Sequence, residues 1–303
     1  MKHAVSISLG SSKRDKRVEV TLLDQKVLIE RIGTDGDMEA AAQLYKEMDG
    51  KVDAFGVGGT DLGILIAGKF YPLYSIHPMI RYVNLTPMVD GSGLKNTLES
   101  QALPELLKYL GERLKNKRVF IVSGAERWGL SKSFFDHGFD CVFGDLMFGL
   151  GLPIPIRTEK SMIMMAALIM PIVGRLPFSW IYPTGEKQEQ RTPKFEKYYQ
   201  WASVLAGDCH YIKKHLPAHL SGKVVITNTT TPEDVELFGK VGISTLVTTT
   251  PSFEGRSFGT NMMEAALVAV AGKGRVLTHK ELTSLITDLE FKPQIMDLSK
   301  MSD

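Results

Sequence analysis

The sequence predicts a two-domain α/β protein whose second half forms a parallel sheet with helices on both faces. The chain has 303 residues, which is more than one ordinary core accommodates. After residue 118, apolar strand-like segments alternate with helix-like segments, a pattern typical of parallel sheets. Before that point strand-like segments dominate, and the long amphipathic segment 94–116 is a suitable connector.

These observations divide the chain between residues 115 and 116. We expect residues 1–115 to form a mixed α/β domain that binds substrate. Residues 116–303 are expected to form a Rossmann-like domain that binds a nucleotide or cofactor, with a methionine-rich insertion at 155–195.

The individual elements follow from hydrophobic period and turn residues. β-branched apolar runs predict strands, and apolar positions three or four residues apart predict helices. The expected strands are 3–10, 17–24, 25–33, 51–59, 118–124, 140–145, 201–208, 223–230 and 243–251, with a hairpin at 61–74 that turns at residues 67–69. The expected helices are 35–50, 75–84, 94–116 with an interruption at Pro104, 130–138, 209–220, 232–242 and the second half of 252–274.

Composition narrows the class of protein. A net charge of +2, with no broad basic face, argues against a nucleic-acid partner. The two cysteines, Cys141 and Cys209, are far apart, which argues against disulfides and against a zinc site. Together with an N-terminus that does not resemble a signal peptide, this pattern predicts a cytoplasmic protein without a metal.

The segment 161–183 is unusually apolar and rich in methionine. Its uncharged run, 161–174, is shorter than the ~20 residues that span a bilayer. A buried helix broken near Pro171 is therefore expected. Contact with a membrane, a lipid or a second copy in a homodimer is the alternative, since methionine suits an adaptable apolar surface.

Small polar residues follow the strands of the second half. In an open parallel sheet, ligands bind beyond the carboxyl ends of the strands, so these residues are candidates for a cofactor crevice. The candidate cofactor-binding residues are Gly124, Ala125, Glu126, Gly129, Asp145, Asn228, Thr229, Thr248 and Thr249.

The turn "GAERWG", residues 124–129, is the part of this crevice most open to interpretation. Glycine permits a tight turn, and a following helix would aim N–H groups at a phosphate. Asp145 lies at the spacing of a ribose-binding carboxylate, as in sites for NAD, NADP or S-adenosylmethionine. However, the middle glycine of a dinucleotide fingerprint is absent, and Trp128 adds bulk. The alternative is that Gly124 is only a turn residue and Asp145 only a loop cap.

Three glycine-rich loops of the first half are candidates for substrate binding. Asp35 and Asp61 lie in two of them, where turn formation is the simpler interpretation. The third loop, "VDGSGLKNT", contains Asp90, Ser92 and Lys95. A lysine near a carboxylate can be tuned for acid–base work, so Asp90 and Lys95 are the candidate catalytic pair and Ser92 a substrate contact.

The loop "SFEGRSFG" supplies a further candidate. Arg256 could clamp a substrate carboxylate, and Glu254 could contact substrate or simply hold that arginine in place.

Six strings resemble a family of bacterial proteins commonly labelled quinate 5-dehydrogenase. They are SISLGSSKRDK, RIGTDGDME, TPMVDGSGLKNTLE, GDLMFGLGLPIPIR, LPFSWIYPTGEKQ and TPSFEGRSFGTNMMEA, and they extend over nearly the whole chain. The resemblance implies a fold similar to shikimate dehydrogenases and an NAD(P)-linked oxidation of a cyclic polyol acid. In such enzymes a lysine and an aspartate transfer the proton, a role that we assign to Lys95 and Asp90 from the character of their loop.

The leading hypothesis is therefore an NAD- or NADP-dependent oxidoreductase that acts on a hydroxyl of a small carboxylated polyol. A non-redox enzyme that uses S-adenosylmethionine or a nucleotide is the second. The third is a binding protein whose methionine-rich helix docks a lipid or a partner.

Overall fold

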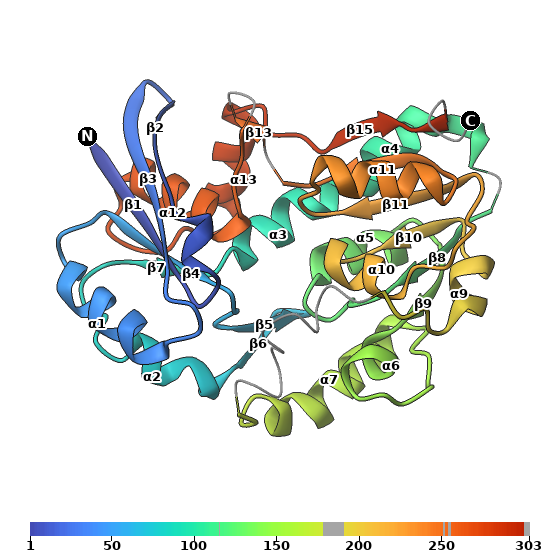
Figure 1. Cartoon of the computed structure of the whole chain (residues 1–303), viewed down its shortest axis with the longest axis horizontal. Coiled ribbons are helices and arrows are strands. Elements are labelled where there is room, and N and C mark those ends of the chain that lie inside the picture. Colours follow the sequence, from blue (N-terminus) through green and yellow to red (C-terminus); the bar gives the residue numbers. More distant parts are fainter. Residues whose placement is uncertain (115, 178–190, 251, 254–255, 300–303) are drawn as a thin grey trace.

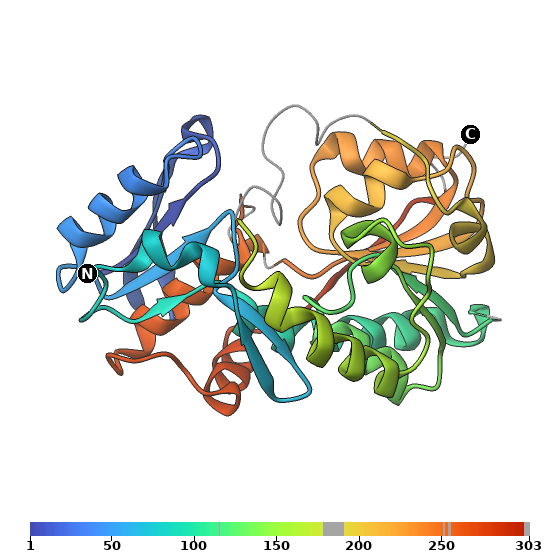
Figure 2. The same ribbon diagram turned by 90° about the horizontal axis from the view of Figure 1, so that it is seen from below.

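The computed structural model describes residues 1–114, 116–177, 191–250, 252–253 and 256–299. It confirms the predicted mixed α/β fold, with two lobes side by side (Figures 1 and 2). We call them the N-terminal lobe, built on the sheet β2-β3-β1-β4-β7, and the C-terminal lobe, built on the sheet β15-β12-β11-β10-β8-β9.

The N-terminal sheet contains the strands that the apolar runs predict. Strand β1 lies between β3 and β4 and is parallel to both. The predicted strands β2 and β3 form an antiparallel hairpin, and its turn residues Leu23 and Asp24 take φ values of 47° and 60°. The strands are β1 (Lys2–Ser8), β2 (Lys16–Leu22), β3 (Gln25–Gly33), β4 (Ala54–Gly58) and β7 (Met88–Val89).

Helix α1 (Met38–Met48) covers one face of this sheet. It begins after Asp37, whose side chain accepts hydrogen bonds from the backbone N–H groups of the first turn. Its buried Tyr45 packs with Val5 and Ile7 of β1, which point to the same face because side chains alternate along a strand.

The opposite face is covered by helices from the far end of the chain. Helix α12 (Thr260–Ala271) lies beside β1 and β4 in Figure 1, well apart from β11 and α11, which come before it in sequence. Its Met263 and Leu267 are fully buried in a cluster with Ala4 and Ile29, and α13 (His279–Asp288) joins the same cluster. The N-terminal lobe is therefore made from two distant chain segments. The exact domain ranges, with their boundary after residue 115, stay a prediction.

The C-terminal sheet is parallel except for its edge strand β15. Its helices lie on both faces, as the alternation of elements predicts. The strands are β8 (Arg118–Ile121), β9 (Asp140–Phe143), β10 (Val204–Ala206), β11 (Lys223–Thr227), β12 (Ile243–Thr248) and β15 (Gln294–Asp297). One face carries α4 (Ala102–Leu110), α5 (Trp128–Asp136) and α7 (Glu159–Val173), and the other α6 (Asp145–Gly149), α9 (Glu196–Trp201), α10 (Cys209–His215) and α11 (Pro232–Lys240).

The remaining elements join or flank the lobes. The segment 94–116 is a succession of α3 (Ser92–Leu98), η3 (Glu99–Gln101), α4 and η4 (Gly111–Arg113). The interruption expected at Pro104 falls earlier, at η3, and Pro104 lies in the first turn of α4. The predicted hairpin forms with its turn at Ala67 and Gly68. The smaller elements are η1 (Ser12–Arg14), β5 (Gly63–Ile66), β6 (Lys69–Pro72), η2 (Tyr74–Ile76), α2 (His77–Ile80), β13 (Ser252–Phe253) and β14 (Arg256–Ser257).

The methionine-rich segment forms α7, which is buried on one side only. The helix was expected to break near Pro171. It continues through Pro171 instead and ends two residues later, at Val173. Met162 and Met170 are buried, whereas the side chains of Leu168 and Ile172 are 68% and 66% exposed. No helix in the described part of the chain is long and apolar enough to cross a membrane. Residues 178–183 of this segment lie outside the described residues.

Candidate active site

The order of the C-terminal strands indicates where in the sheet a ligand would bind. Strand β8 lies between β9 and β10. The chain passes from β8 to β9 through α5 on one face of the sheet, and from β10 to β11 through α10 on the other face. In parallel sheets such a switch point is where the loops separate and a ligand binds. The two loops at this point are the turn after β8, which starts at Gly124, and the residues after β10, which end at Asp208.

A buried arginine lies at this switch point. Arg127 is 3% exposed and forms an ion pair with Glu99, and its Nη2 lies 3.1 Å from Asp208 Oδ2. Its Nε lies 3.5 Å from Glu126 Oε1. Because Glu99 belongs to η3, this arginine ties the connector between the lobes to the ends of β8 and β10. A buried guanidinium requires such partners, since an unpaired charge there is strongly destabilising.

Lys95 faces this cluster from α3 and pairs with Asp61. Its Nζ donates to Asp61 Oδ1 at 2.7 Å, and both side chains are largely buried. Burial alone would lower the pKa of Lys95, but the carboxylates of Asp61 and Glu126 raise it above the ordinary value. The ammonium group is therefore charged at neutral pH.

Asp90 holds the backbone around this ion pair. The pair expected from the sequence was Asp90 with Lys95, whereas the carboxylate of Asp90 accepts the backbone N–H of Leu62 at 2.6 Å and that of Ser92 at 2.9 Å. Ser92 thus contributes its N–H as the first residue of α3. Asp90 connects the loop of Asp61 to the helix of Lys95. Burial and the charge of Asp61 raise the pKa of Asp90.

Two further carboxyl groups have strongly raised pKa values. Burial raises the pKa of Glu126 to about 7, against the opposing charges of Arg127 and Lys95. Burial also raises the pKa of Glu264 to about 7, and its Oε2 accepts the backbone N–H of Leu94 at 3.0 Å. A carboxyl group that titrates near neutrality is able both to take up and to release a proton.

The glycines of the turn at 124–129 are explained by packing. A Cβ atom on Gly124 would lie 2.3 Å from Cδ1 of Phe143. One on Gly129 would lie 2.6 Å from the backbone oxygen of Asn96, and the N–H of Gly129 donates to Asn96 Oδ1 at 3.0 Å. Gly129 therefore lets α5 approach α3, the helix that carries Lys95.

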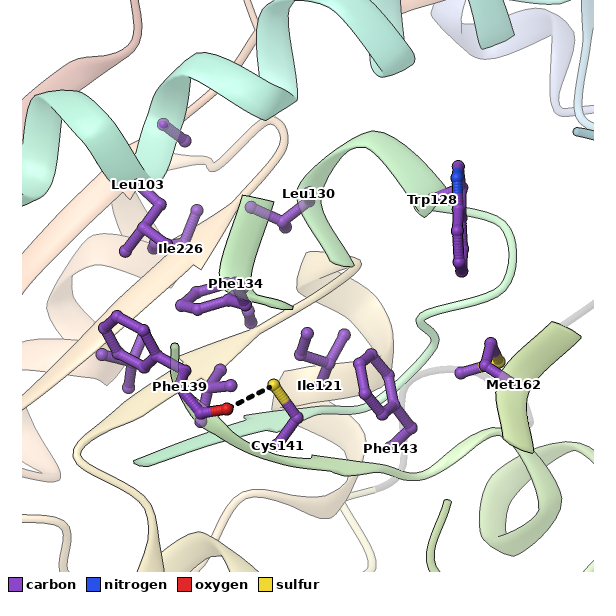
Figure 3. Close-up of a cluster of buried hydrophobic side chains, with 14 of the residues drawn as sticks. Leu103, Ile121, Trp128, Leu130, Phe134, Phe139, Cys141, Phe143, Met162 and Ile226 are labelled. Atoms are coloured by element: carbon purple, nitrogen blue, oxygen red, sulfur yellow. Dashed lines mark hydrogen bonds between the residues drawn. The ribbon is translucent and has the colours of Figure 1, made fainter. Parts of the chain in front are cut away.

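The same turn is held by Asp145 from the end of β9. The N–H of Ala125 donates to Asp145 Oδ1 at 2.8 Å, and that of Gly124 to Oδ2 at 3.1 Å. Burial raises the pKa of Asp145 to about 6, although these N–H groups oppose the shift. Trp128 is buried in the same apolar cluster as Phe143 and Met162 (Figure 3). Asp145 lies where a ribose-binding carboxylate is expected, but each of its oxygens already accepts one N–H group of the turn.

The polar residues after β11 and β12 come together at the same edge of the sheet. Asn228 Nδ2 donates to Asp208 Oδ2 at 2.8 Å, which joins this group to the arginine cluster. The hydroxyl groups of Thr229 and Thr250 lie 2.8 Å apart. Thr248 lines a pocket with these residues, and Thr249 donates from its backbone and its hydroxyl to the carbonyl of Thr227.

The remaining candidates are not part of this arrangement. Asp35 is exposed, and its carboxylate accepts the backbone N–H and hydroxyl of Ser12 at 2.9 and 2.7 Å. It therefore stabilises a turn of the N-terminal lobe. Glu254 lies outside the described residues, and Arg256 is located only as a backbone position in β14. Among the described residues no three His, Cys, Asp or Glu side chains form a group suited to a metal.

Sequence reasoning missed four members of the cluster as site residues: Glu99, Arg127, Asp208 and Glu264. Asp208 directly follows a strand, as does the turn of Arg127, so strand-end position was a usable signal for both. Glu99 lies within a helical pattern and Glu264 in the first turns of a distant helix. Neither position differs in sequence from a solvated helical glutamate.

Comparisons with solved structures give only a loose likeness in fold. An NAD-dependent malic enzyme from Thermotoga maritima is 12% identical with a TM-score of 0.37, and the match covers 94% of this chain and 84% of that one. A periplasmic solute-binding protein of an ABC transporter from Actinobacillus succinogenes 130z, with bound D-allose, is 12% identical with a TM-score of 0.38, and the match covers 99% of both chains. Such values carry no argument about activity.

Family models match most of the sequence. No curated protein matches it. Residues 3–90 match the model of a domain of unknown function, DUF8753. Residues 93–298 match the model of another domain of unknown function, DUF8754, and they make up more than half of the chain. The chain therefore belongs to the DUF8754 family.

Proposed function

We propose that the protein is an enzyme that transfers a proton at a hydroxyl group of a small polyhydroxylated substrate held between the lobes. One observation carries the proposal. Lys95 and Asp61 form an ion pair with 2.7 Å between Nζ and Oδ1. The charges of both side chains act on Glu126, whose pKa is raised by burial to about 7. A fixed cation beside a carboxyl group that titrates near neutrality is suited to general acid–base catalysis.

The three side chains take different roles. As the O–H bond of the substrate breaks, the carboxylate of Glu126 accepts the proton. The ammonium group of Lys95 stabilises the negative charge that develops on the oxygen. Asp61 keeps Lys95 charged and oriented, since it forms a short ion pair with it. In the reverse direction Glu126, now protonated, donates to the oxygen.

The finer version of this proposal is the oxidoreductase that the resemblance implies, with a quinate- or shikimate-like substrate and NAD or NADP as the hydride acceptor. The turn after β8 does not fit a pyrophosphate as it stands. The N–H groups of Gly124 and Ala125 donate to Asp145, and that of Gly129 donates to Asn96. The carboxylates around Arg127 would also repel a diphosphate. Redox chemistry therefore requires a nicotinamide site elsewhere, or release of Asp145.

A non-redox enzyme is the second candidate, favoured by the same occupied N–H groups. S-adenosylmethionine lacks a pyrophosphate, so it needs no cradle of N–H groups at this turn. Isothermal titration with NAD, NADP and S-adenosylmethionine under one set of conditions separates the candidates. Binding of a nicotinamide cofactor supports the oxidoreductase, and binding of S-adenosylmethionine alone contradicts it.

Lys95→Met tests proton transfer directly. Purified protein is incubated with a panel of polyhydroxylated acids that includes quinate and shikimate, with and without each cofactor, and products are followed by NMR. We expect at least a hundredfold loss of turnover in Lys95→Met, because acid–base groups contribute about 10²–10⁴-fold. Lys132→Met is the control, since Lys132 pairs with Asp136 on the exposed face of α5. Equal losses in both variants would contradict the proposal.

Binding through the exposed face of α7 is a third candidate, carried by the exposure of Met164, Leu168 and Ile172 at helical spacing. Apolar stripes of this kind mark contacts with lipids, partners or a second copy. Co-sedimentation with liposomes and analytical ultracentrifugation measure these contacts. Met164→Glu with Leu168→Glu should abolish either one without altering ligand binding between the lobes. The cytoplasmic location expected from the sequence stays a prediction.

A further inference from the structure

A pocket without charged lining residues lies at the ends of β11 and β12. It lies at the same edge of the C-terminal sheet as the ion pairs of Arg127 with Glu99 and Asp208, which we call the ion cluster. Its volume is about 250 Å³. We call it the threonine pocket. It is lined by Asn228, Thr229, Thr230, Thr231, Pro232, Val235, Thr248, Thr250, Gln294 and Met296. The volume falls below the ~300–1,000 Å³ of pockets for drug-sized ligands, so it suits a single ring or a short polar chain.

The lining offers hydrogen bonds but no charge. None of the lining residues is ionisable, although the adjoining cluster is rich in carboxylates. A hydroxyl group has one donor and two acceptor positions, so the pair of Thr229 and Thr250, 2.8 Å apart, keeps unused capacity on both oxygens. Val235 and Met296 add apolar wall against which C–H groups can pack.

The adjoining helix does not convert the pocket into an anion site. Helix α11 begins here, and free N–H groups at a helix start would attract a phosphate. However, Thr231 and Asp234 form a capping box: the N–H of Thr231 donates to Asp234 Oδ2 at 2.9 Å, and the N–H of Asp234 donates to Thr231 Oγ1 at 3.3 Å. The first turn also carries Glu233 and Asp234, which would repel an anion.

We propose that the threonine pocket binds an uncharged, hydroxyl-bearing ring of the kind found in a neutral polyol. Such a ring presents hydroxyl groups to the threonines and the amides, and C–H groups to the apolar wall. Asn228 lies between this pocket and the ion cluster, since it lines the former and donates to Asp208 of the latter. The inference rests on the proposed function in one respect: the ring would be the part of the substrate remote from Lys95.

Binding in the pocket can be measured without turnover. Saturation-transfer NMR titration with myo-inositol as the probe is expected to give a signal with the wild-type protein and with Lys95→Met. Thr229→Val combined with Thr250→Val removes both hydroxyl groups at nearly constant volume, and we expect at least tenfold weaker binding. Thr283→Val is the control, because that hydroxyl donates to the backbone carbonyl of His279 on the exposed side of α13. Binding in the control should equal that of the wild type.

Thr250 is buried, so its replacement can disturb folding, whereas Thr229 is exposed. Thr229→Val is therefore also tested alone, and we expect it to bind myo-inositol about fivefold more weakly than the wild type. The proposal is overturned if myo-inositol does not bind the wild type, if the threonine variants bind as well as the control, or if inorganic phosphate displaces myo-inositol. Measurements of turnover distinguish failure of the proposed proton transfer from failure of the threonine-pocket proposal. Equal product formation by Lys95→Met and wild type would refute proton transfer, while loss of inositol binding in Thr229→Val would still support the pocket.

Discussion

Lys95 keeps its charge because of its neighbours, and this dependence is measurable. In Asp61→Asn the nearest carboxylate is lost, so burial has more weight and the pKa of the Lys95 amine falls. The rate at which acetic anhydride labels Lys95, followed by peptide mass spectrometry, should reach half of its maximum at a lower pH than in the wild type. Asp53→Asn, which breaks the half-exposed pair with Lys2, is the control. An unchanged labelling profile in Asp61→Asn would contradict the role of this pair.

Glu264 makes stability depend on pH in a defined window. Its folded-state pKa is raised by burial to about 7, so the folded protein binds this proton more tightly than the unfolded chain does. Its contribution to the free energy of unfolding is therefore greatest below about pH 4 and is lost progressively as the pH rises to about 7. Over this range the loss is about 3 kcal/mol.

Glu264→Gln tests this assignment, because glutamine retains an acceptor for the N–H of Leu94 but does not titrate. Relative to the variant, the wild type should lose stability between pH 4 and pH 7 in urea unfolding. Glu290→Gln, at an exposed position after α13, should parallel the wild type throughout. A constant difference between wild type and Glu264→Gln at all pH values would show that the carboxyl group does not titrate in this window.

The approach of α5 to α3 depends on a single missing side chain. In Gly129→Ala the new Cβ would lie 2.6 Å from the backbone oxygen of Asn96, so the two helices must separate. Overpacking of this kind typically costs about 1–3 kcal/mol. Gly149→Ala is a matched control, because a Cβ atom at that position in α6 meets nothing within 4 Å. Urea unfolding should show a lower midpoint for Gly129→Ala only, and equal midpoints would refute the packing explanation of this glycine.

Elements were predictable where a local pattern determines them. Alternating apolar runs predicted the strands around Val5 and Phe120, and turn residues predicted the hairpin of β5 and β6. The sheet against which each helix packs was harder to predict. Helix α12 has almost entirely buried, small and apolar side chains, which suits either sheet, and only tertiary packing assigns it to the N-terminal lobe.

The candidate site was predictable in part for the same reason. Lys95 and the strand-end polar residues were found because their loops follow apolar strands. The carboxylate that pairs with Lys95 was not found, because Asp61 and Asp90 both follow strands of one sheet. Only the fold determines which of the two meets the ammonium group. The turn at Gly124 was open to two interpretations because a packing glycine and a phosphate-binding glycine are identical in sequence.

The whole molecule depends on a chain segment that returns to the first lobe. Residues 1–115 alone would leave the face that α12 covers, including Ala4 and Ile29, open to water. We therefore expect this fragment to remain unfolded by NMR, and to fold when it is co-expressed with residues 256–303. A well-dispersed spectrum of the isolated fragment would show that the predicted domain boundary after residue 115 is sufficient.

The return of α12 also has a consequence for biosynthesis. The last strand of the N-terminal sheet ends at Val89, but the helix that completes its core starts at Thr260. Translation proceeds at about 5–20 residues per second, so the strands of the first sheet are synthesised roughly ten to thirty seconds before helix α12. During that time the nascent chain exposes one apolar face of a sheet. The protein should therefore depend on ribosome-associated chaperones during synthesis more than its final stability would indicate.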